Sequence, residues 1–140
     1  MNLPVRTLLA AMLPLALAGC INDAASYMIG GDRHHAITLT RTQKWFWEDK
    51  VILSIVAARQ PDCMGGLEIQ DVSSNEPIPL HQAPDVYAEP IYILDAGGHA
   101  YAISTQSCQV QKFETTPTDQ GPVIGNFTTV DGQFQYVPVK

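Results

Sequence analysis

The amino-acid sequence predicts an all-β domain, a small antiparallel sandwich or open barrel of about six to eight strands. Short segments alternate between apolar and polar residues, as half-buried strands do. An Asp131-Gly132 pair, typical of a tight hairpin turn, separates two such segments near the end of the chain. No stretch sustains the 3.6-residue period of an amphipathic helix. The alternative is an α+β fold with one short helix near Trp45, because residues 42–50 have room for a helical turn.

The first strands are expected from His35 onward. Ile37 and Leu39 alternate with threonines, which is the pattern of a strand with one buried face. Residues 51–58 are nearly all apolar and rich in β-branched side chains. This composition predicts a central strand that is buried on both faces. A shorter strand is expected at residues 67–72.

A proline-rich stretch follows at residues 75–90. Proline has no backbone N–H to donate to a sheet, and it restricts the residue before it. The stretch is therefore predicted to be a loop of about 15 residues, a length at which loops are functional or mobile. Its prolines are Pro77, Pro79, Pro84 and Pro90.

A hairpin is predicted where residues 91–94 and 99–105 flank Asp95-Ala96-Gly97-Gly98. The glycines suit a turn, and two loop lengths fit this hairpin, so its register stays open. Residues 108–113 are expected to continue as a third strand.

The hairpin around Asp131-Gly132 is better specified. This pair suits a two-residue type I′ turn, which fixes the strand register. The register places Phe127 opposite Tyr136 and Thr129 opposite Phe134. A cross-strand aromatic pair is worth roughly 0.2–1 kcal/mol relative to alanines.

The first twenty residues have the form of an export signal. Arg6 is followed by an apolar run at residues 8–18, which is shorter than the ~20 residues that a membrane-spanning helix needs. The run ends in Leu17-Ala18-Gly19-Cys20, which resembles the lipobox of bacterial lipoproteins. An ordinary signal peptide cleaved after Ala18 is the alternative, because Ala16-Leu17-Ala18 fits an A-x-A site.

The lipobox resemblance implies that the protein is attached to a membrane. In this family the Cys thiol receives a diacylglycerol, the chain is cut before the Cys, and the new amine is acylated with a fatty acid such as palmitate. Two or three acyl chains hold a protein stably on a membrane. Ile21, rather than Asp, follows Cys20, and in the family this implies the outer membrane, with the domain facing the periplasm.

The resulting organisation has three parts. Residues 1–19 are the signal peptide, residues 20–34 the lipidated N-terminus with a short tether, and residues 35–140 the β-rich domain. The tether is expected to be irregular because polar residues and glycines recur in it, namely Asn22, Asp23, Ser26, Gly30 and Gly31.

Three cysteines are present, Cys20, Cys63 and Cys108. If Cys20 carries lipid, Cys63 and Cys108 remain to form one disulfide, as suits an exported protein. Such a bridge would stabilise the fold by roughly 4 kcal/mol on the chain-entropy model. Two buried free thiols are the alternative.

The charge of the chain is acidic. Eight Lys and Arg stand against fourteen Asp and Glu, for a net charge of −6, and loss of Arg6 with the signal makes it about −7. Nucleic acid is therefore excluded as a partner, because phosphate binding needs a basic face.

No residue pattern identifies a catalytic site, a metal or a cofactor. The histidines, His34, His35, His81 and His99, lack the short matched spacings of zinc ligands. The serines have no nucleophile-elbow context. The sequence therefore predicts a non-catalytic structural, assembly or accessory module that binds an envelope protein partner or another envelope component. The alternative is a periplasmic enzyme or small-ligand binder that uses the proline-rich loop as a lid.

Trp45 and Trp47 are the candidate partner-binding residues. In an extended segment both indoles lie on one face, and tryptophan is enriched at binding hot spots. Packing in the core is the ordinary alternative for such residues. The exposure of the two indoles in the folded protein distinguishes these interpretations.

Overall fold

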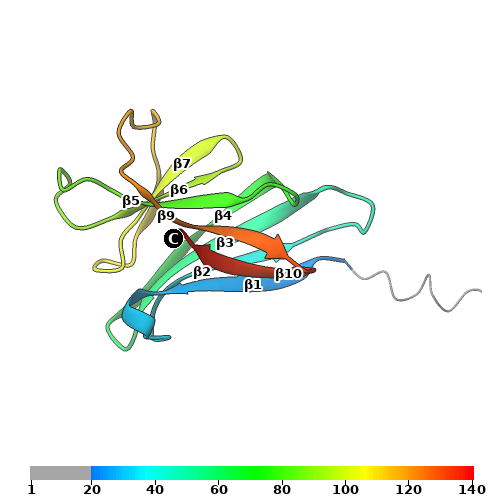
Figure 1. The fold of residues 1–140 in the computed structure, drawn as a ribbon, viewed down its shortest axis with the longest axis horizontal. Coiled ribbons are helices and arrows are strands. Elements are labelled where there is room, and N and C mark those ends of the chain that lie inside the picture. Colours follow the sequence, from blue (N-terminus) through cyan, green and yellow to red (C-terminus); the bar gives the residue numbers. More distant parts are fainter. Residues whose placement is uncertain (1–19) are drawn as a thin grey trace, which may run out of the picture.

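The computed structural model describes residues 20–140, which form two antiparallel sheets packed face to face (Figure 1). The first sheet has the order β1-β2-β3-β4, with β1 (Asn22–Met28), β2 (His35–Thr42), β3 (Lys50–Arg59) and β4 (Cys63–Ser73). The second has the order β10-β9-β5-β6-β7-β8, with β5 (Ile78–Gln82), β6 (Tyr92–Ala96), β7 (His99–Ile103), β8 (Val110–Lys112), β9 (Val123–Val130) and β10 (Gln133–Pro138). The predicted all-β class is confirmed as a sandwich, although the described residues form ten strands.

The segment predicted as an irregular tether is instead strand β1. It pairs with β2 along its whole length, from Asn22 opposite Thr42 to Met28 opposite Ala36. An edge strand tolerates polar residues because one of its sides is open to solvent. Ser26, for example, shares a 2.8 Å hydrogen bond with Thr38 of β2. A short 3-10 turn, η2 (Ile29–Gly31), then leads toward β2.

Strand β3 is central in its sheet, as predicted, but its burial is one-sided. Val51, Leu53, Ile55 and Ala57 are buried, and the residues between them are only half-buried. The alternation arises because the second sheet covers one face of β3 only. The prediction of burial on both faces is therefore wrong.

The proline-rich stretch is not one long loop, because it contains β5 between β9 and β6. The hydrogen-bonding direction alternates along a strand. The Gln82 N–H donates to the Pro122 carbonyl on the β9 side, so Pro79 faces the β6 side. Pairing with β6 begins only at Leu80. The missing N–H of Pro79 therefore removes no bond that the sheet uses.

Both predicted hairpins are present. In the β6–β7 hairpin, Ala96 pairs with His99, so the loop is the two residues Gly97 and Gly98, both with positive φ. A tight type I′ turn requires this backbone conformation.

In the β9–β10 hairpin, the predicted register is confirmed. Phe127 lies opposite Tyr136, and Thr129 lies opposite Phe134. The Phe127 and Tyr136 ring centroids are 5.1 Å apart.

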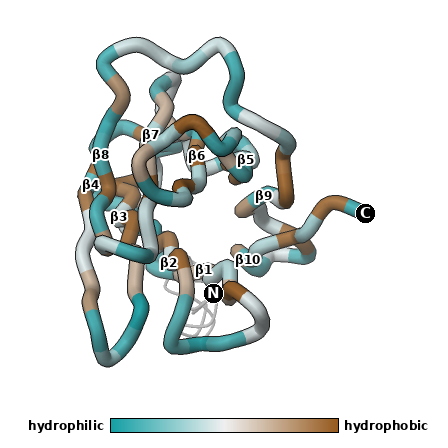
Figure 2. The backbone as a smooth tube through the Cα atoms, turned by 90° about the vertical axis from the view of Figure 1, so that its left-hand side faces the viewer, coloured by the Kyte–Doolittle hydropathy of each residue, from teal (hydrophilic) through white to brown (hydrophobic). Residues whose placement is uncertain are grey.

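The two sheets meet at two seams (Figure 2). At one seam β1 lies beside β10, and Tyr27 packs against Tyr136 with 4.8 Å between ring centroids and against Tyr92 with 5.7 Å. At the other, β4 lies beside β8, and the Cys63–Cys108 disulfide joins the start of β4 to the segment before β8. Within residues 20–140, no backbone ladder crosses either seam. Side chains therefore join the sheets.

Arg41 is a further link between the sheets. Its guanidinium donates to both carboxylate oxygens of Asp23 on β1, at 2.8 and 2.7 Å, and to the Ser74 carbonyl at 3.0 Å. It also lies 3.9 Å from the centroid of the Phe134 ring on β10. The buried arginine thus contacts β1, the β4–β5 connection and β10 at once.

Candidate functional site

Three aromatic side chains stand at the tip of the β2–β3 connection. We call Trp45, Phe46 and Trp47 the aromatic loop; they are 54%, 64% and 66% exposed. The two indoles stack with 5.2 Å between centroids and 12° between planes, and Phe46 packs edge-on against Trp47. Core packing of these tryptophans is therefore excluded, and residues 45–48 form a turn rather than a helix or a strand.

Gln43 holds the base of this loop. Its backbone N–H donates to the Ile21 carbonyl at 2.9 Å, and its side-chain oxygen accepts from the Ile21 N–H at 3.0 Å. Its side-chain nitrogen donates to the Glu48 carbonyl on the far side of the loop. Because Gln43 is buried and both ends of its amide are used, it joins Ile21 to the aromatic loop.

Cys20 lies one residue before this junction. It is exposed and forms no disulfide with the other two cysteines. The start of β1 and the β2–β3 connection lie at the same end of the first sheet (Figure 1). The other residues of the predicted lipobox, 17–19, fall outside the described part of the chain. The sequence had singled out Cys20 and the tryptophans separately, and the fold places both segments at this end of the first sheet.

The charges around the aromatic loop are balanced. Lys44 and Lys50 flank it and are exposed, as is Asp49, whereas Glu48 is half-buried. The Asp49 carbonyl accepts from the Ser74 N–H at 2.8 Å, so the second arm of the loop is tied to the β4–β5 connection.

The predicted disulfide between Cys63 and Cys108 is present, with 5.8 Å between the Cα atoms. Gly65 makes the close approach possible, because a Cβ there would lie 2.2 Å from the Cys108 carbonyl oxygen. No local sequence pattern marks this glycine. In the structure it lies within β4, under the chain that leads to β8.

His34 and His35 are neighbours in the chain, and His81 and His99 lie in two other strands, β5 and β7. The side chain of His35 hydrogen-bonds Thr105 at 2.8 Å, and His34 and His99 are exposed. Within residues 20–140, no three His, Cys, Asp or Glu side chains lie close enough together to hold a metal ion.

His81 belongs to a polar cluster beside a surface hollow. Its Nε2 lies 2.8 Å from an Asp95 oxygen, and its Nδ1 lies 3.0 Å from the Gly121 carbonyl. The Gln120 amide, with its nitrogen toward Asp95, donates to both carboxylate oxygens at 3.1 and 2.8 Å. Both ring nitrogens of His81 therefore have hydrogen-bond partners within the fold.

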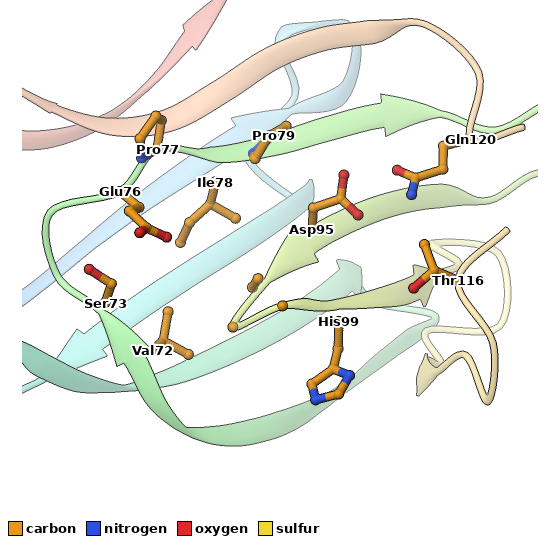
Figure 3. A pocket seen from close by; sticks show the side chains of 13 residues that line it. Val72, Ser73, Glu76, Pro77, Ile78, Pro79, Asp95, His99, Thr116 and Gln120 are labelled. Atoms are coloured by element: carbon orange, nitrogen blue, oxygen red, sulfur yellow. The ribbon is translucent and has the colours of Figure 1, made fainter. Parts of the chain in front are cut away.

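The hollow itself has a volume of about 380 Å³. Ser73 and Glu76 lie at one end and Thr116 and Gln120 at the other, with Asp95 between them (Figure 3). The ring of His99 points away from Asp95, as the β6–β7 register requires. Among these lining side chains, Asp95 and Gln120 are bonded to each other.

Ser104 has a similar internal role. It is buried, and its hydroxyl oxygen accepts from the backbone N–H groups of Gln106 and Ser107 at 3.1 and 3.2 Å. It thereby caps the turn that leads to Cys108.

Comparisons with protein-family models, curated proteins and solved structures found no match to this chain. The part of the chain that the structure describes has no helix with the length and apolar character needed to cross a bilayer.

Proposed function

We propose that this protein is a lipid-anchored module of the bacterial cell envelope, held on the outer membrane through acylated Cys20 and facing the periplasm. Its role is non-catalytic: it is a structural, assembly or accessory domain that binds an envelope partner. The single observation that carries the anchor is the position of Cys20, which follows Leu17-Ala18-Gly19 and stands exposed just before the first strand.

The disulfide supports an exported location. Disulfides persist in oxidising compartments such as the periplasm and are rare in the cytosol. The Cys63–Cys108 bridge leaves Cys20 as the cysteine without a disulfide partner. A single thiol at the start of the folded domain is what lipid attachment needs.

A binding role is supported by the aromatic loop, and a catalytic one has less support. Large exposed aromatics mark contact surfaces in soluble domains. The polar groups best suited to acid–base chemistry, those of His81 and Asp95, are bonded to one another and to the backbone. The proline-rich stretch that would serve as a lid in the alternative function contains strand β5.

The test is the intact mass of protein extracted from membranes. We expect a chain that starts at Cys20 and carries a diacylglycerol and one fatty acid, with the mass of one disulfide. A Cys20→Ser variant should lose the lipid and leave the membrane fraction. A native chain that begins upstream of Gly19, or one that is soluble and unacylated, would contradict the proposal.

A further inference from the structure

We propose that the aromatic loop inserts into the surface of the same membrane that holds Cys20, so that two neighbouring attachments fix the orientation of the domain. This inference rests on the proposed lipid anchor. The juxtaposition that carries it is the hydrogen-bonded pair of Gln43 and Ile21, which places the loop beside the acylated residue.

Lipid on Cys20 would place the bilayer surface close to the aromatic loop. Consecutive Cα atoms are about 3.8 Å apart, and one residue, Ile21, links Cys20 to Gln43. Acyl chains on Cys20 enter the membrane there, so lipid headgroups lie against the base of the aromatic loop. Little room remains for a protein domain between the loop and the bilayer, which favours lipid as the occupant.

The chemistry of the loop suits a membrane surface. Tryptophan is enriched at membrane interfaces, because its ring is apolar and its N–H keeps a polar partner. Trp45, Phe46 and Trp47 are each more than half exposed, and they pack on one another rather than on the sandwich. They form one compact apolar cluster at the end of the domain nearest Cys20.

The flanking charges are compatible with this placement. Lys44 and Lys50 have long side chains that keep an ammonium among lipid phosphates while their stems stay apolar. The backbone of Asp49 is tied through its carbonyl to Ser74, and its side chain is exposed beside those of the two lysines. The acidic remainder of the domain is repelled by anionic lipid, which keeps the contact confined to this end.

The consequence is an oriented domain. A single lipid anchor allows the sandwich to rotate about Cys20, and a second contact at the aromatic loop restricts that rotation. The loop that follows β5, which contains the 78%-exposed Val86, lies at the opposite end of the sandwich (Figure 1). It is then presented away from the membrane.

The experiment uses intrinsic fluorescence, because the two tryptophans of the chain are Trp45 and Trp47. The lipidated, full mature chain is reconstituted into vesicles of phosphatidylethanolamine and phosphatidylglycerol, with or without phospholipid brominated near the headgroup. We expect a blue-shifted emission relative to the unlipidated Cys20→Ser chain in buffer, loss of emission with brominated lipid, and protection from iodide.

A matched control places the fluorophore at the far end. In a Trp45→Phe/Trp47→Phe/Val86→Trp variant, the tryptophan should be quenched by iodide and not by brominated lipid. Near-ultraviolet circular dichroism and urea unfolding of this variant show whether it is folded. A Gln43→Ala variant should lose part of the lipid quenching while it stays on the vesicles.

Two results separate failure of the inference from failure of the anchor. Protein that sediments with vesicles but keeps iodide-accessible tryptophans, unaffected by brominated lipid, overturns loop insertion and leaves the anchor standing. Native protein that lacks lipid and does not sediment overturns both. A photo-crosslinker at residue 46 that labels a protein rather than phospholipid in cells also overturns the inference.

Discussion

The Tyr136 ring lies directly over Gly125, where a side chain at residue 125 would stand: a Cβ there would be 2.3 Å from Cζ and Oη of the tyrosine. Tyr136 also packs against Tyr27, across the seam between the sheets, and against Phe127 in its own sheet. The glycine therefore provides the space in which the aromatic seam closes. The contribution of this contact to stability can be measured with substitutions at Gly125 and Tyr136.

Gly125→Ala should destabilise the fold by about 1–3 kcal/mol, the usual range for overpacking. Tyr27 and Phe127 pack against the Tyr136 ring and restrict its movement away from residue 125. Urea unfolding measures the loss. In a Tyr136→Leu background the same change should cost clearly less, because the ring is absent. Equal costs in both backgrounds would show that the ring is not the obstacle.

The free energy of unfolding should fall at high pH, because the tyrosines of the aromatic seam then ionise. Burial, helped by the neighbouring Tyr27, raises the pKa of Tyr92 to about 12, and burial with the same neighbour raises the pKa of Tyr136 to about 12. Unfolded tyrosine has a pKa of about 10, so the folded state favours the neutral phenols. Their contribution is fully present below pH 10 and is lost as the pH rises from 10 to 12.

The measurement is urea unfolding across this pH window, with absorbance titration of the phenols. A Tyr136→Phe variant should show a smaller loss of stability between pH 10 and 12. A loss identical to that of the unmodified chain would contradict a role for Tyr136.

Asp23→Ala should lower the free energy of unfolding more than Arg41→Met does. The Arg41 side chain is 6% exposed and that of Asp23 is 35% exposed. Asp23→Ala leaves a buried guanidinium without its partner, at a cost of about 3–5 kcal/mol. Arg41→Met leaves a carboxylate that reaches water and fills the buried site with an apolar chain. We expect it to lose about 1–3 kcal/mol. Chemical unfolding of the two variants compares them, and the reverse order would contradict this account.

Loss of the disulfide should lower stability by up to about 4 kcal/mol, because the bridge closes a loop with a sequence separation of 45. A Cys63→Ala/Cys108→Ala variant tests this by urea unfolding. Gly65→Ala, which would press on the Cys108 carbonyl, should cost more stability in the oxidised chain than in the Cys63→Ala/Cys108→Ala variant. Equal costs in the two backgrounds would mean that Gly65 does not serve the bridge.

Local patterns predicted much of the fold, and they failed where pairing is remote. The Asp131-Gly132 turn fixed the facing of Phe127 and Tyr136, because a two-residue loop permits one register. Strand β5 was missed because the proline rule depends on which side of a strand faces a partner. Residue type alone does not supply that information. Strand β1 was missed because its polar residues find partners on β2, such as Thr38 for Ser26 and Arg41 for Asp23.

The residues of the candidate site likewise divide into those that the local sequence marks and one that only the fold reveals. The lipobox-like motif, the odd cysteine count and the paired tryptophans mark Cys20, Cys63, Cys108, Trp45 and Trp47 in the sequence, since each depends on neighbouring residues or on a count. Gln43 carries no local signal, and its role exists only after β1 is placed beside β2.

The sequence by itself determined the all-β class, the last hairpin and the residues that stand out chemically, because periodicity and turn chemistry act over a few residues. The tertiary structure decided that the tryptophans are exposed and that Gln43 binds Ile21. It also decided that the sheets meet through a tyrosine seam and a disulfide. These outcomes depend on which distant segments share an edge, and that is set by the packing of the whole sandwich.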